Sequence, residues 1–203
     1  MPNLKKILKL SLFGICLILT IPLSLMAYIE KKITPSEELF VCFGQFLALF
    51  PGIIGSYLRT AYYFFSLNRC SWEIRIGFGS YFTHRGASMD ANASMGSYCV
   101  IGSAQIGKGV MMASHVSIPS GKRQHFDATG GISSEPRFDK VTIGAGCWIG
   151  EGAIILADVG SHCIVSAGTV VINNMPDGQL IAGNPGKPIR ALKQKNADYR
   201  RSK

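Results

Sequence analysis

Residues 143–171 read IGAGCWIGEGAIILADVGSHCIVSAGTVV, and the spacing within this stretch decides the fold. Single aliphatic residues recur at every sixth position in two groups of three: Ile143, Ile149 and Ile155, then Val159, Val165 and Val171. A period of six fits neither the 3.6-residue turn of an α-helix nor the two-residue alternation of a strand. It is typical of a triangular coil, in which each side is one short strand with an aliphatic side chain pointing to the axis. Glycine, which tolerates unusual backbone angles, then forms the corners.

The same six-residue step continues toward the N-terminus in two further groups: Met89, Met95 and Ile101, then Ile106, Met112 and Ile118. Ile76 and Phe82 begin a partial coil before them. Stacked coils bury each other's aliphatic side chains in one column, and a chance match of twelve positions in an ordinary β-sandwich is a poor alternative. The sequence therefore predicts an all-β domain, a parallel β-helix of hexapeptide repeats, over residues 74–175.

Three of the six cysteines, Cys99, Cys147 and Cys163, each lie four residues after an aliphatic residue of the repeat. This position takes a small side chain at a corner of the coil, so we expect buried, reduced thiols there. No CxxC pair occurs in the sequence, which excludes a zinc knuckle and a thioredoxin-like redox motif.

Residues 1–73 lack the repeat and are expected to form a membrane-anchoring helical region. Residues 10–29 carry no charged side chain. Twenty helical residues at 1.5 Å each span about 30 Å, the hydrocarbon thickness of a bilayer. Lys5, Lys6 and Lys9 precede this run, as they would in a retained anchor. A cleaved signal peptide, which has the same basic start, is the alternative.

A second uncharged stretch, residues 39–58, is interrupted by Pro51 and Gly52. It is consistent with a second crossing, a re-entrant segment or an interfacial helix. Two crossings with the N-terminus in the cytoplasm would return the chain to the cytoplasm from residue 60 onward. We therefore expect membrane lipid as a partner and a β-helix that faces the cytoplasm.

The chain carries only 16% charged residues but has a formal net charge of +9. Residues 187–203 hold seven basic residues against the single acid Asp198, so most of the excess lies in this tail. A basic segment of this kind contacts an anionic surface, either lipid headgroups or ligand phosphates. Because no basic-aromatic stripe or groove-reading motif accompanies it, we expect no nucleic-acid partner.

Three stretches resemble the hexapeptide-repeat acyltransferases: residues 143–150 (IGAGCWIG), 166–171 (SAGTVV) and 182–190 (AGNPGKPIR). The resemblance extends over about residues 74–192. It is to the branch that contains the maltose and galactoside O-acetyltransferases and the O-acetyltransferases of bacterial surface-polysaccharide synthesis. It implies a left-handed coil, a homotrimer, and transfer of an acetyl group from acetyl-CoA to a sugar hydroxyl. The apolar N-terminal region is not part of the soluble sugar acetyltransferases and looks like members dedicated to lipid-linked or envelope glycans.

The repeat is interrupted between Ile118 and Ile143 by a polar, glycine-rich segment, residues 119–142, which a solenoid extrudes as a loop. This loop contains His125, and acetyl transfer to an alcohol needs a base that is neutral near pH 7. In the related acetyltransferases the catalytic histidine stands in such a loop, so the resemblance assigns the role to His125. His115, on the coil before the loop, is the second candidate because it could face the same groove. The expected mechanism is direct attack of the sugar hydroxyl on the thioester, with backbone N–H groups stabilising the oxyanion.

The other histidines have competing interpretations. His162 stands at a corner of the coil, where a solvated residue is expected, and His84 precedes the regular coils, where a structural and an acceptor-side role are both open. The γ-class carbonic anhydrases share this coil but need three histidines that converge on zinc, two of them close in sequence, so we expect no metal. Asp127 or Glu135 could orient the imidazole of His125.

The resemblance also implies where coenzyme A binds. Trp148 matches the family's tryptophan beside the groove for the pantetheine arm, and Ala167 matches a residue whose backbone meets that arm. Lys187 and Arg190 match cationic positions near the 3′-phosphate, and paired cations suit phosphate binding. A packing role at the trimer interface is the alternative for Trp148.

Together these residues predict a membrane-associated O-acetyltransferase at the bacterial inner membrane, with its catalytic domain facing the cytoplasm. The donor is acetyl-CoA, and the acceptor is a sugar hydroxyl of a surface or exported glycan or of a lipid-linked sugar. Residues 176–203 are expected to form a C-terminal cap and a basic tail. Two alternatives stay open. One is an N-acyltransferase acting on an amino sugar nucleotide, and the other is a non-catalytic β-helix scaffold in a glycan-synthesis complex.

Overall fold

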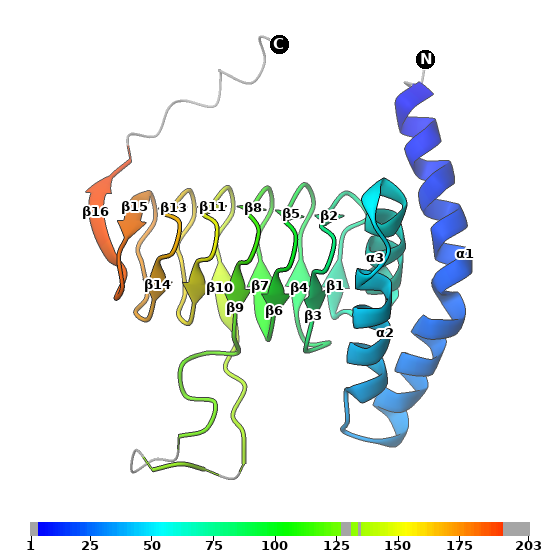
Figure 1. The fold of residues 1–203 in the computed structure, drawn as a ribbon, viewed down its shortest axis with the longest axis horizontal. Coiled ribbons are helices and arrows are strands. Elements are labelled where there is room, and N and C mark those ends of the chain that lie inside the picture. Colours follow the sequence, from blue (N-terminus) through cyan, green and yellow to red (C-terminus); the bar gives the residue numbers. More distant parts are fainter. Residues whose placement is uncertain (1–3, 127–130, 134, 193–203) are drawn as a thin grey trace.

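A computed structural model describes residues 4–126, 131–133 and 135–192. Three helices stand at one end of a column of stacked coils: α1 (Leu4–Ile33), α2 (Glu38–Ala48) and α3 (Gly52–Ser66). We refer to these three helices as the helical cap. The column begins at Arg69, and one long loop projects from its side (Figure 1).

The strands of the column form three sheets, one on each side of a triangular coil. Sheet A consists of β1 (Arg69–Cys70), β4 (Ser88–Met89), β7 (Ala104–Ile106) and β10 (Val141–Ile143). Sheet B consists of β2 (Arg75–Ile76), β5 (Ser94–Met95), β8 (Met111–Met112), β11 (Trp148–Ile149), β13 (Ile164–Val165), β15 (Gln179–Ala182) and β16 (Lys187–Ala191). Sheet C consists of β3 (Tyr81–Phe82), β6 (Val100–Ile101), β9 (Ser117–Ile118), β12 (Ile154–Ile155) and β14 (Val170–Val171). All of these strands pair in parallel except β15 with β16, so the fold is a parallel β-helix.

The twelve aliphatic residues of the repeat form the core of the column, and each is at most 5% exposed. Corresponding residues of successive coils lie directly beside one another: Met89 pairs with Ile106, and Ile106 pairs with Ile143. Cys70 pairs with Met89 in sheet A, so it occupies the inward-facing position of sheet A in the first coil. The first coil is therefore complete, and it begins before residue 74. The parallel β-helix predicted from the six-residue spacing is confirmed.

The cysteines of the repeat are packed inside the column. Cys99, Cys147 and Cys163 are at most 1% exposed, and all six cysteines of the chain are free thiols. Burial raises the pKa of Cys147 to about 12, so this sulfur stays protonated at neutral pH. The prediction of small, buried, reduced side chains at these three positions is confirmed.

The loop leaves the column between β9 and β10 without disturbing the stacking on either side. Ile106 before the insertion pairs with Ile143 after it in sheet A, and Ser117 pairs with Ile154 across the same gap in sheet C. The insertion is therefore extruded, as its polar sequence predicts. It departs and returns at the corner between sheets C and A, which we call the C–A corner.

A buried arginine joins the helical cap to the first coil. Arg59 of α3 is 0% exposed. Its guanidinium donates hydrogen bonds to the carbonyl oxygens of Leu47 (3.0 Å) and Phe50 (2.8 Å), at and beyond the end of α2. It also donates to the carbonyl oxygen of Ile76 in β2 (3.1 Å). Burial lowers the pKa of Arg59 to about 10, so the group stays charged at neutral pH and ties α2, α3 and β2 together.

One helix of the cap is long and apolar enough to cross a membrane, by length and composition: α1, over Lys6–Ile33. The second apolar stretch, residues 39–58, is divided between α2 with 11 residues and α3 with 15. Helices of these lengths extend about 17 and 23 Å at 1.5 Å per residue, which is less than the ~30 Å of a bilayer core. Neither helix by itself is therefore long enough for a straight crossing, and the second crossing, the re-entrant segment and the interfacial helix all stay predictions.

Candidate active site

His125 lies on the extruded loop, in a part that backbone hydrogen bonds hold in place. The amide of Arg137 donates to the carbonyl oxygen of Gln124 (2.8 Å), and the amide of Ser133 donates to that of His125 itself (2.8 Å). The His125 side chain is exposed. The imidazole is therefore carried on a paired segment of backbone, on the loop that projects from the column in Figure 1, where a substrate can reach it.

The sequence offers two carboxylates, Asp127 and Glu135, as partners for this imidazole. Asp127 lies outside the described residues. Glu135 is described, and it contacts Ser133 through its backbone: its amide donates to the Ser133 hydroxyl (3.1 Å), and that hydroxyl donates to the Glu135 carbonyl oxygen (3.0 Å). The role of orienting His125 stays a prediction for both residues.

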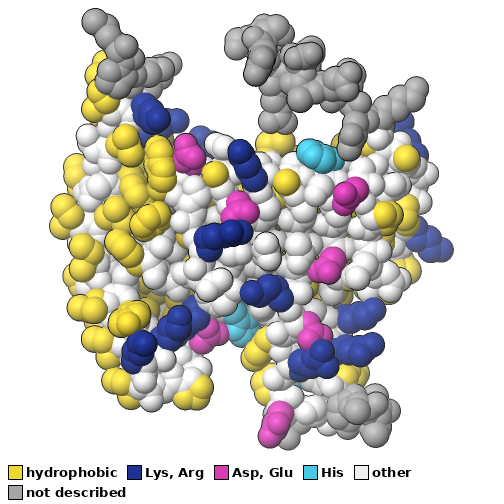
Figure 2. All heavy atoms as spheres, turned by 180° about the vertical axis from the view of Figure 1, so that it is seen from behind, with side chains coloured by type: hydrophobic (Ala, Val, Ile, Leu, Met, Phe, Trp, Pro, Cys, Tyr) yellow, Lys and Arg dark blue, Asp and Glu magenta, His cyan; other side chains and the backbone are white. Residues whose placement is uncertain are grey.

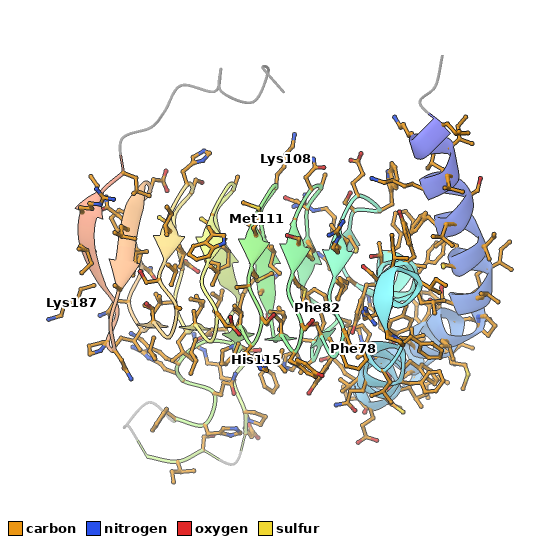
Figure 3. All side chains as sticks on the ribbon, turned by 45° about the horizontal axis from the view of Figure 1, so that its top comes forward. Phe78, Phe82, Lys108, Met111, His115 and Lys187 are labelled. Carbon is orange, nitrogen blue, oxygen red and sulfur yellow. The ribbon has the colours of Figure 1, made fainter. Side chains whose placement is uncertain are left out.

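His115 occupies a different corner, between sheets B and C, which we call the B–C corner. Its ring stacks on Tyr98 of the previous coil, with centroids 5.2 Å apart and planes at 14°, and Tyr98 meets Phe78 edge-on at 5.6 Å. Tyr98 and His115 both adopt the left-handed backbone conformation, with φ of 58° and 59°. Figure 3 shows Phe78 and His115 along one edge of the column. His115 thus belongs to an aromatic stack, on another corner than the loop that carries His125.

The outer face of sheet B carries Trp148, which is 43% exposed. Trp148 pairs with Met111 of β8 and with Ile164 of β13, and Ile164 pairs with Leu180 of β15. Residues that lie opposite one another in paired strands project from the same face, so these four side chains form an apolar row. Ala167 is exposed at the adjoining B–C corner.

Lys187 and Arg190 lie on β16, the last strand of sheet B. In a regular strand, residues three positions apart point to opposite faces. The pairing with β15 contains a register shift, however, so that Lys187 pairs with Ala182 and Arg190 pairs with Leu180. Because Ile181 between these partners is buried in the column, both cations share the outer face of sheet B. In Figure 3, Lys187 projects from the far end of the column.

The structure therefore gathers the predicted coenzyme A residues on one side of the chain. Trp148, Ala167, Lys187 and Arg190 lie on sheet B and its B–C corner, whereas the loop with His125 departs from the C–A corner. A site that uses both sets of residues needs the loop of one chain to meet sheet B of another.

His84 forms a tight polar contact near the loop, which sequence reasoning did not identify. Its Nδ1 lies 2.6 Å from Oε2 of Glu37, and Oε1 of Glu37 accepts a hydrogen bond from the amide of Arg85 (2.8 Å). Burial opposes the charge on Glu37, but the hydrogen bonds and charges of His84 and Arg85 hold its pKa below the usual value. Glu37 is therefore a carboxylate that fixes the proton of His84 on Nδ1. The ring of Phe138, from the loop, lies 4.2 Å from the His84 ring.

A cavity of about 470 Å³ opens beside this pair. Its lining comes from α2, from the corner between β3 and β4, and from the loop, and includes Glu38, Val41, Gln45, Thr83, His84 and Phe138. A smaller cavity of about 210 Å³ lies at the base of the loop, and its lining includes Lys122, Asp139, Lys140 and Asp158. Both cavities combine segments that are far apart in the sequence, so no local pattern predicts them.

Among residues 4–126, 131–133 and 135–192, no group of three or more His, Cys, Asp or Glu side chains could hold a metal ion. His162 is exposed at the corner between sheets A and B, with a φ of 58°. Its position agrees with that of a solvated corner residue.

No family model matches the chain. Among curated proteins, the chain is 38% identical over 60 residues to 2,3,4,5-tetrahydropyridine-2,6-dicarboxylate N-acetyltransferase of Clostridium perfringens, a match that covers 30% of this chain and 24% of that protein. The chain spans only about a third or less of the length of the curated relatives it matches, with shares of 30%, 32% and 24%.

Among solved structures, a maltose O-acetyltransferase from Clostridium difficile 630 has a TM-score of 0.61 at 21% identity, covering 76% of this chain and 86% of that one. A variant of AntD, an N-acyltransferase from Bacillus cereus, was solved with dTDP-4-amino-4,6-dideoxyglucose and coenzyme A. It has a TM-score of 0.51 at 17% identity, covering 60% of this chain and 71% of that one. Both likenesses show a shared fold.

Proposed function

We propose that the protein is an acetyl-CoA-dependent acyltransferase, because parts of its sequence are related to an acetyltransferase and its column has the fold of a maltose O-acetyltransferase. We assign it O-acetylation of a sugar hydroxyl on a glycan or a lipid-linked sugar, with the left-handed coil and the homotrimer that the resemblance implies. The observation that carries the proposal is the exposed imidazole of His125, on a loop that leaves the stacking of the column intact.

In the proposed reaction, His125 removes the proton of the acceptor hydroxyl while the hydroxyl oxygen attacks the thioester carbonyl of acetyl-CoA. The tetrahedral oxyanion is stabilised by backbone N–H groups, and it collapses as the carbon–sulfur bond breaks. The imidazolium then returns its proton to the departing thiolate. The products are the acetate ester and coenzyme A, and no covalent intermediate on the protein is needed.

The outer face of sheet B fits the donor. Trp148 and Ile164 offer an apolar surface to the pantetheine arm, and the exposed Ala167 adjoins it at the B–C corner. Lys187 and Arg190 lie farther along the same face, where paired cations suit the phosphates of coenzyme A.

Replacing both Lys187 and Arg190 by alanine is expected to raise the KM for acetyl-CoA about tenfold, the equivalent of ~1.4 kcal/mol of lost binding, with kcat nearly unchanged. The penalty should be smaller with 3′-dephospho-acetyl-CoA, which lacks the phosphate. Steady-state kinetics with both donors measures this. Lys108→Ala, at an exposed lysine on another corner of the column, is the matched control. An equal effect of the control would refute the assignment of the two cations.

A homotrimer is supported by the outer faces of the sheets. Sheet B carries the apolar row through Trp148, and sheet C carries Ile154 and Val170, which are paired and project outward. Sheet A instead presents Gln105 and Thr142. Two apolar faces that meet at the B–C corner favour burial against copies of the same chain. Such an assembly would also bring the loop of one chain to sheet B of the next.

We also propose that the helical cap binds a membrane surface, with α1 lying flat in the interface. Figure 2 shows hydrophobic side chains gathered over the helical cap. In α1, eight such side chains are more than half exposed: Leu4, Leu8, Ile15, Ile18, Leu19, Leu25, Tyr28 and Ile33. Exposed lysines flank this apolar surface at both ends of the helix, namely Lys6, Lys9, Lys31 and Lys32. An apolar surface with basic ends suits the boundary between acyl chains and anionic headgroups.

The packing of α1 favours the flat orientation over a crossing. Phe13 of α1 contacts Trp72 of the first coil, with centroids 6.1 Å apart, and the carbonyl oxygen of Ala27 accepts a hydrogen bond from Arg85 (3.0 Å). Phe13 and Ala27 lie about 21 Å apart along the helix at 1.5 Å per residue. If α1 crossed the ~30 Å core of a bilayer, most of the first coil would lie beside it in hydrocarbon. The exposed Glu73, next to Trp72, would then bear the large cost of a charge at that depth.

Single cysteines at the two ends of α1 are expected to react from the same side of a vesicle. Lys9→Cys and Lys32→Cys are made in a Cys42→Ser background, which removes the native exposed thiol. The full chain is bound to phosphatidylcholine–phosphatidylglycerol vesicles and treated with an impermeant maleimide. Gln105→Cys, on the outer face of sheet A, reports on which side of the vesicle membrane the column lies. Labelling of the two ends from opposite sides would contradict the flat orientation, and failure of the protein to float with vesicles would contradict membrane binding altogether.

The two alternatives predict different products. Mass spectrometry of the surface glycan, from cells with and without the gene, distinguishes a missing acetate ester from a missing acetamide and so separates O- from N-acetylation. The scaffold predicts that the protein does not bind acetyl-CoA and that loss of His125 has no consequence. Calorimetric titration with acetyl-CoA tests the scaffold directly.

A further inference from the structure

The 470 Å³ cavity beside His84 is lined neither by His125 nor by the residues proposed to bind coenzyme A. We propose that it is the acceptor site, and that it binds the ring of a neutral or amino sugar. The inference rests on the proposed acetyl transfer only in that such a reaction needs an acceptor. Its volume lies in the range of ligand pockets, about 300–1,000 Å³.

The walls of the cavity are held by a buried ion-pair network. Nη2 of Arg85 lies 2.6 Å from Oε2 of Glu30, and Nε lies 3.2 Å from Oε1 of Glu37. The side chains of Arg85 and Glu30 are only 11% and 6% exposed. Arg85 also donates to the carbonyl oxygen of Ser36 (2.9 Å). The network joins the end of α1, the turn before α2 and the corner between β3 and β4, so the cavity is formed before any ligand arrives.

His84 gives the cavity a hydrogen-bonding atom of defined type. Its Nδ1 lies 2.6 Å from Oε2 of Glu37, and in the tautomer that donates this hydrogen bond from Nδ1 the other ring nitrogen, Nε2, is an acceptor. The side chain is 19% exposed and lines the cavity. A sugar hydroxyl is a donor that satisfies such an acceptor.

The other lining residues match the two kinds of surface on a sugar ring. Phe138 is 48% exposed and presents an aromatic ring, on which the C–H face of a sugar can pack. Glu38, Gln45 and Thr83 supply acceptors and donors for hydroxyl groups. This combination of one aromatic surface with several polar groups that fix orientation is typical of a small-molecule site.

The charge of the cavity selects among sugars. Glu30 and Glu37 are both paired with Arg85, whereas Glu38 forms no ion pair with any other residue that the structure describes. The uncompensated carboxylate repels an acidic sugar and attracts the ammonium group of an amino sugar. A neutral ring is tolerated because its hydroxyl groups donate hydrogen bonds to the same carboxylate.

The cavity also lies next to the candidate base. Phe138 follows Arg137, whose amide donates to the carbonyl oxygen of Gln124 (2.8 Å), and His125 is the next residue after Gln124. A sugar packed on Phe138 therefore lies beside the segment of the loop that carries His125. The acceptor and the base would then come from one chain, and the donor would come from sheet B of its neighbour.

Sugar binding in the absence of acetyl-CoA tests the proposal separately from catalysis. Saturation-transfer NMR on the full chain in detergent uses three probes: methyl β-D-glucopyranoside, glucosamine and glucuronic acid. We expect the first two to bind and glucuronic acid to bind at least about tenfold more weakly, the equivalent of ~1.4 kcal/mol. Phe138→Ala should weaken binding of the glucoside about tenfold. Ile132→Ala is the matched control, because Ile132 is an apolar loop residue that is 89% exposed, and it should leave binding unchanged.

Gln45→Ala provides a second variant, since Gln45 is exposed on α2 and belongs neither to the loop nor to the ion-pair network. Weaker glucoside binding by both variants supports the site if both variants keep the unfolding temperature of the unmodified chain. Unchanged binding in both variants overturns it, as does the absence of binding by all three probes. Tighter binding of glucuronic acid overturns the assigned class of sugar. If the probes bind as expected but acquire no acetyl group when acetyl-CoA is added, the site stands and the proposed acetyl transfer fails.

Discussion

His125→Ala is expected to lower the rate of acetyl transfer by about 10²–10⁴-fold, the contribution of a general base. The side chain lies on an extruded loop and adds nothing to the aliphatic column, so the unfolding temperature and the oligomeric state should stay as they are. Release of coenzyme A in the presence of an acceptor sugar measures the rate, and circular dichroism measures the unfolding temperature.

His115→Ala is the matched control, because it removes the other candidate imidazole. His115 stacks on Tyr98 at 5.2 Å, so its loss should cost about 0.5–1.5 kcal/mol of stability and little activity. The reverse pattern, with activity kept in His125→Ala and lost in His115→Ala, would show that the base was assigned to the wrong corner of the coil.

Arg59→Ala is expected to have the largest effect on stability, lowering the free energy of unfolding by about 3–5 kcal/mol. The substitution removes a donor from the carbonyl oxygens of Leu47, Phe50 and Ile76, of which Leu47 keeps a longer hydrogen bond from the amide of Phe50 (3.3 Å). An unsatisfied buried carbonyl costs about 1–3 kcal/mol, and all three lie where the helical cap meets the first coil. Chemical denaturation measures the loss, and limited proteolysis should show cleavage between the cap and the column.

Two further variants separate charge from geometry at this position. Arg59→Lys keeps the positive charge but lacks the planar fork of five donors, so its stability should fall between those of Arg59→Ala and the unmodified chain. Arg69→Ala removes a surface arginine of the first coil. The Arg69 side chain is 60% exposed, and its Nη2 lies 2.9 Å from Oδ1 of Asp90. Its effect should stay within about 0.5 kcal/mol. If Arg59→Ala were no worse than Arg69→Ala, the buried guanidinium would not be what holds the cap.

The column could be predicted from the sequence because the residues that specify each coil lie close to one another along the chain. Each aliphatic position of the repeat packs against the corresponding position of the next coil, so one spacing, repeated, specifies both the strand and its neighbours. The insertion between Ile118 and Ile143 was visible for the same reason, as an interruption of that spacing.

The polar contacts could not be predicted in this way. His84 and Glu37 are separated by 47 positions, and no periodicity relates a turn between helices to a corner of the coil. Arg59 directly follows the uncharged residues 39–58 in the sequence, and only the packing of α2 and α3 shows that carbonyl oxygens surround it. The shared face of Lys187 and Arg190 also escaped prediction, since it depends on a shift in register against β15.

The last strand of sheet B has a consequence for how copies of the protein meet. A parallel β-helix is open at both ends, and each open end offers free N–H and C=O groups on which another copy could add strands indefinitely, as in a fibre. In this chain α2 and α3 cover the first coil, and β16 covers the last by running antiparallel to β15. Pro188 in β16 has no N–H to donate, and the exposed Lys187 and Arg190 repel an identical strand. End-to-end addition of strands is therefore disfavoured at both ends of the column.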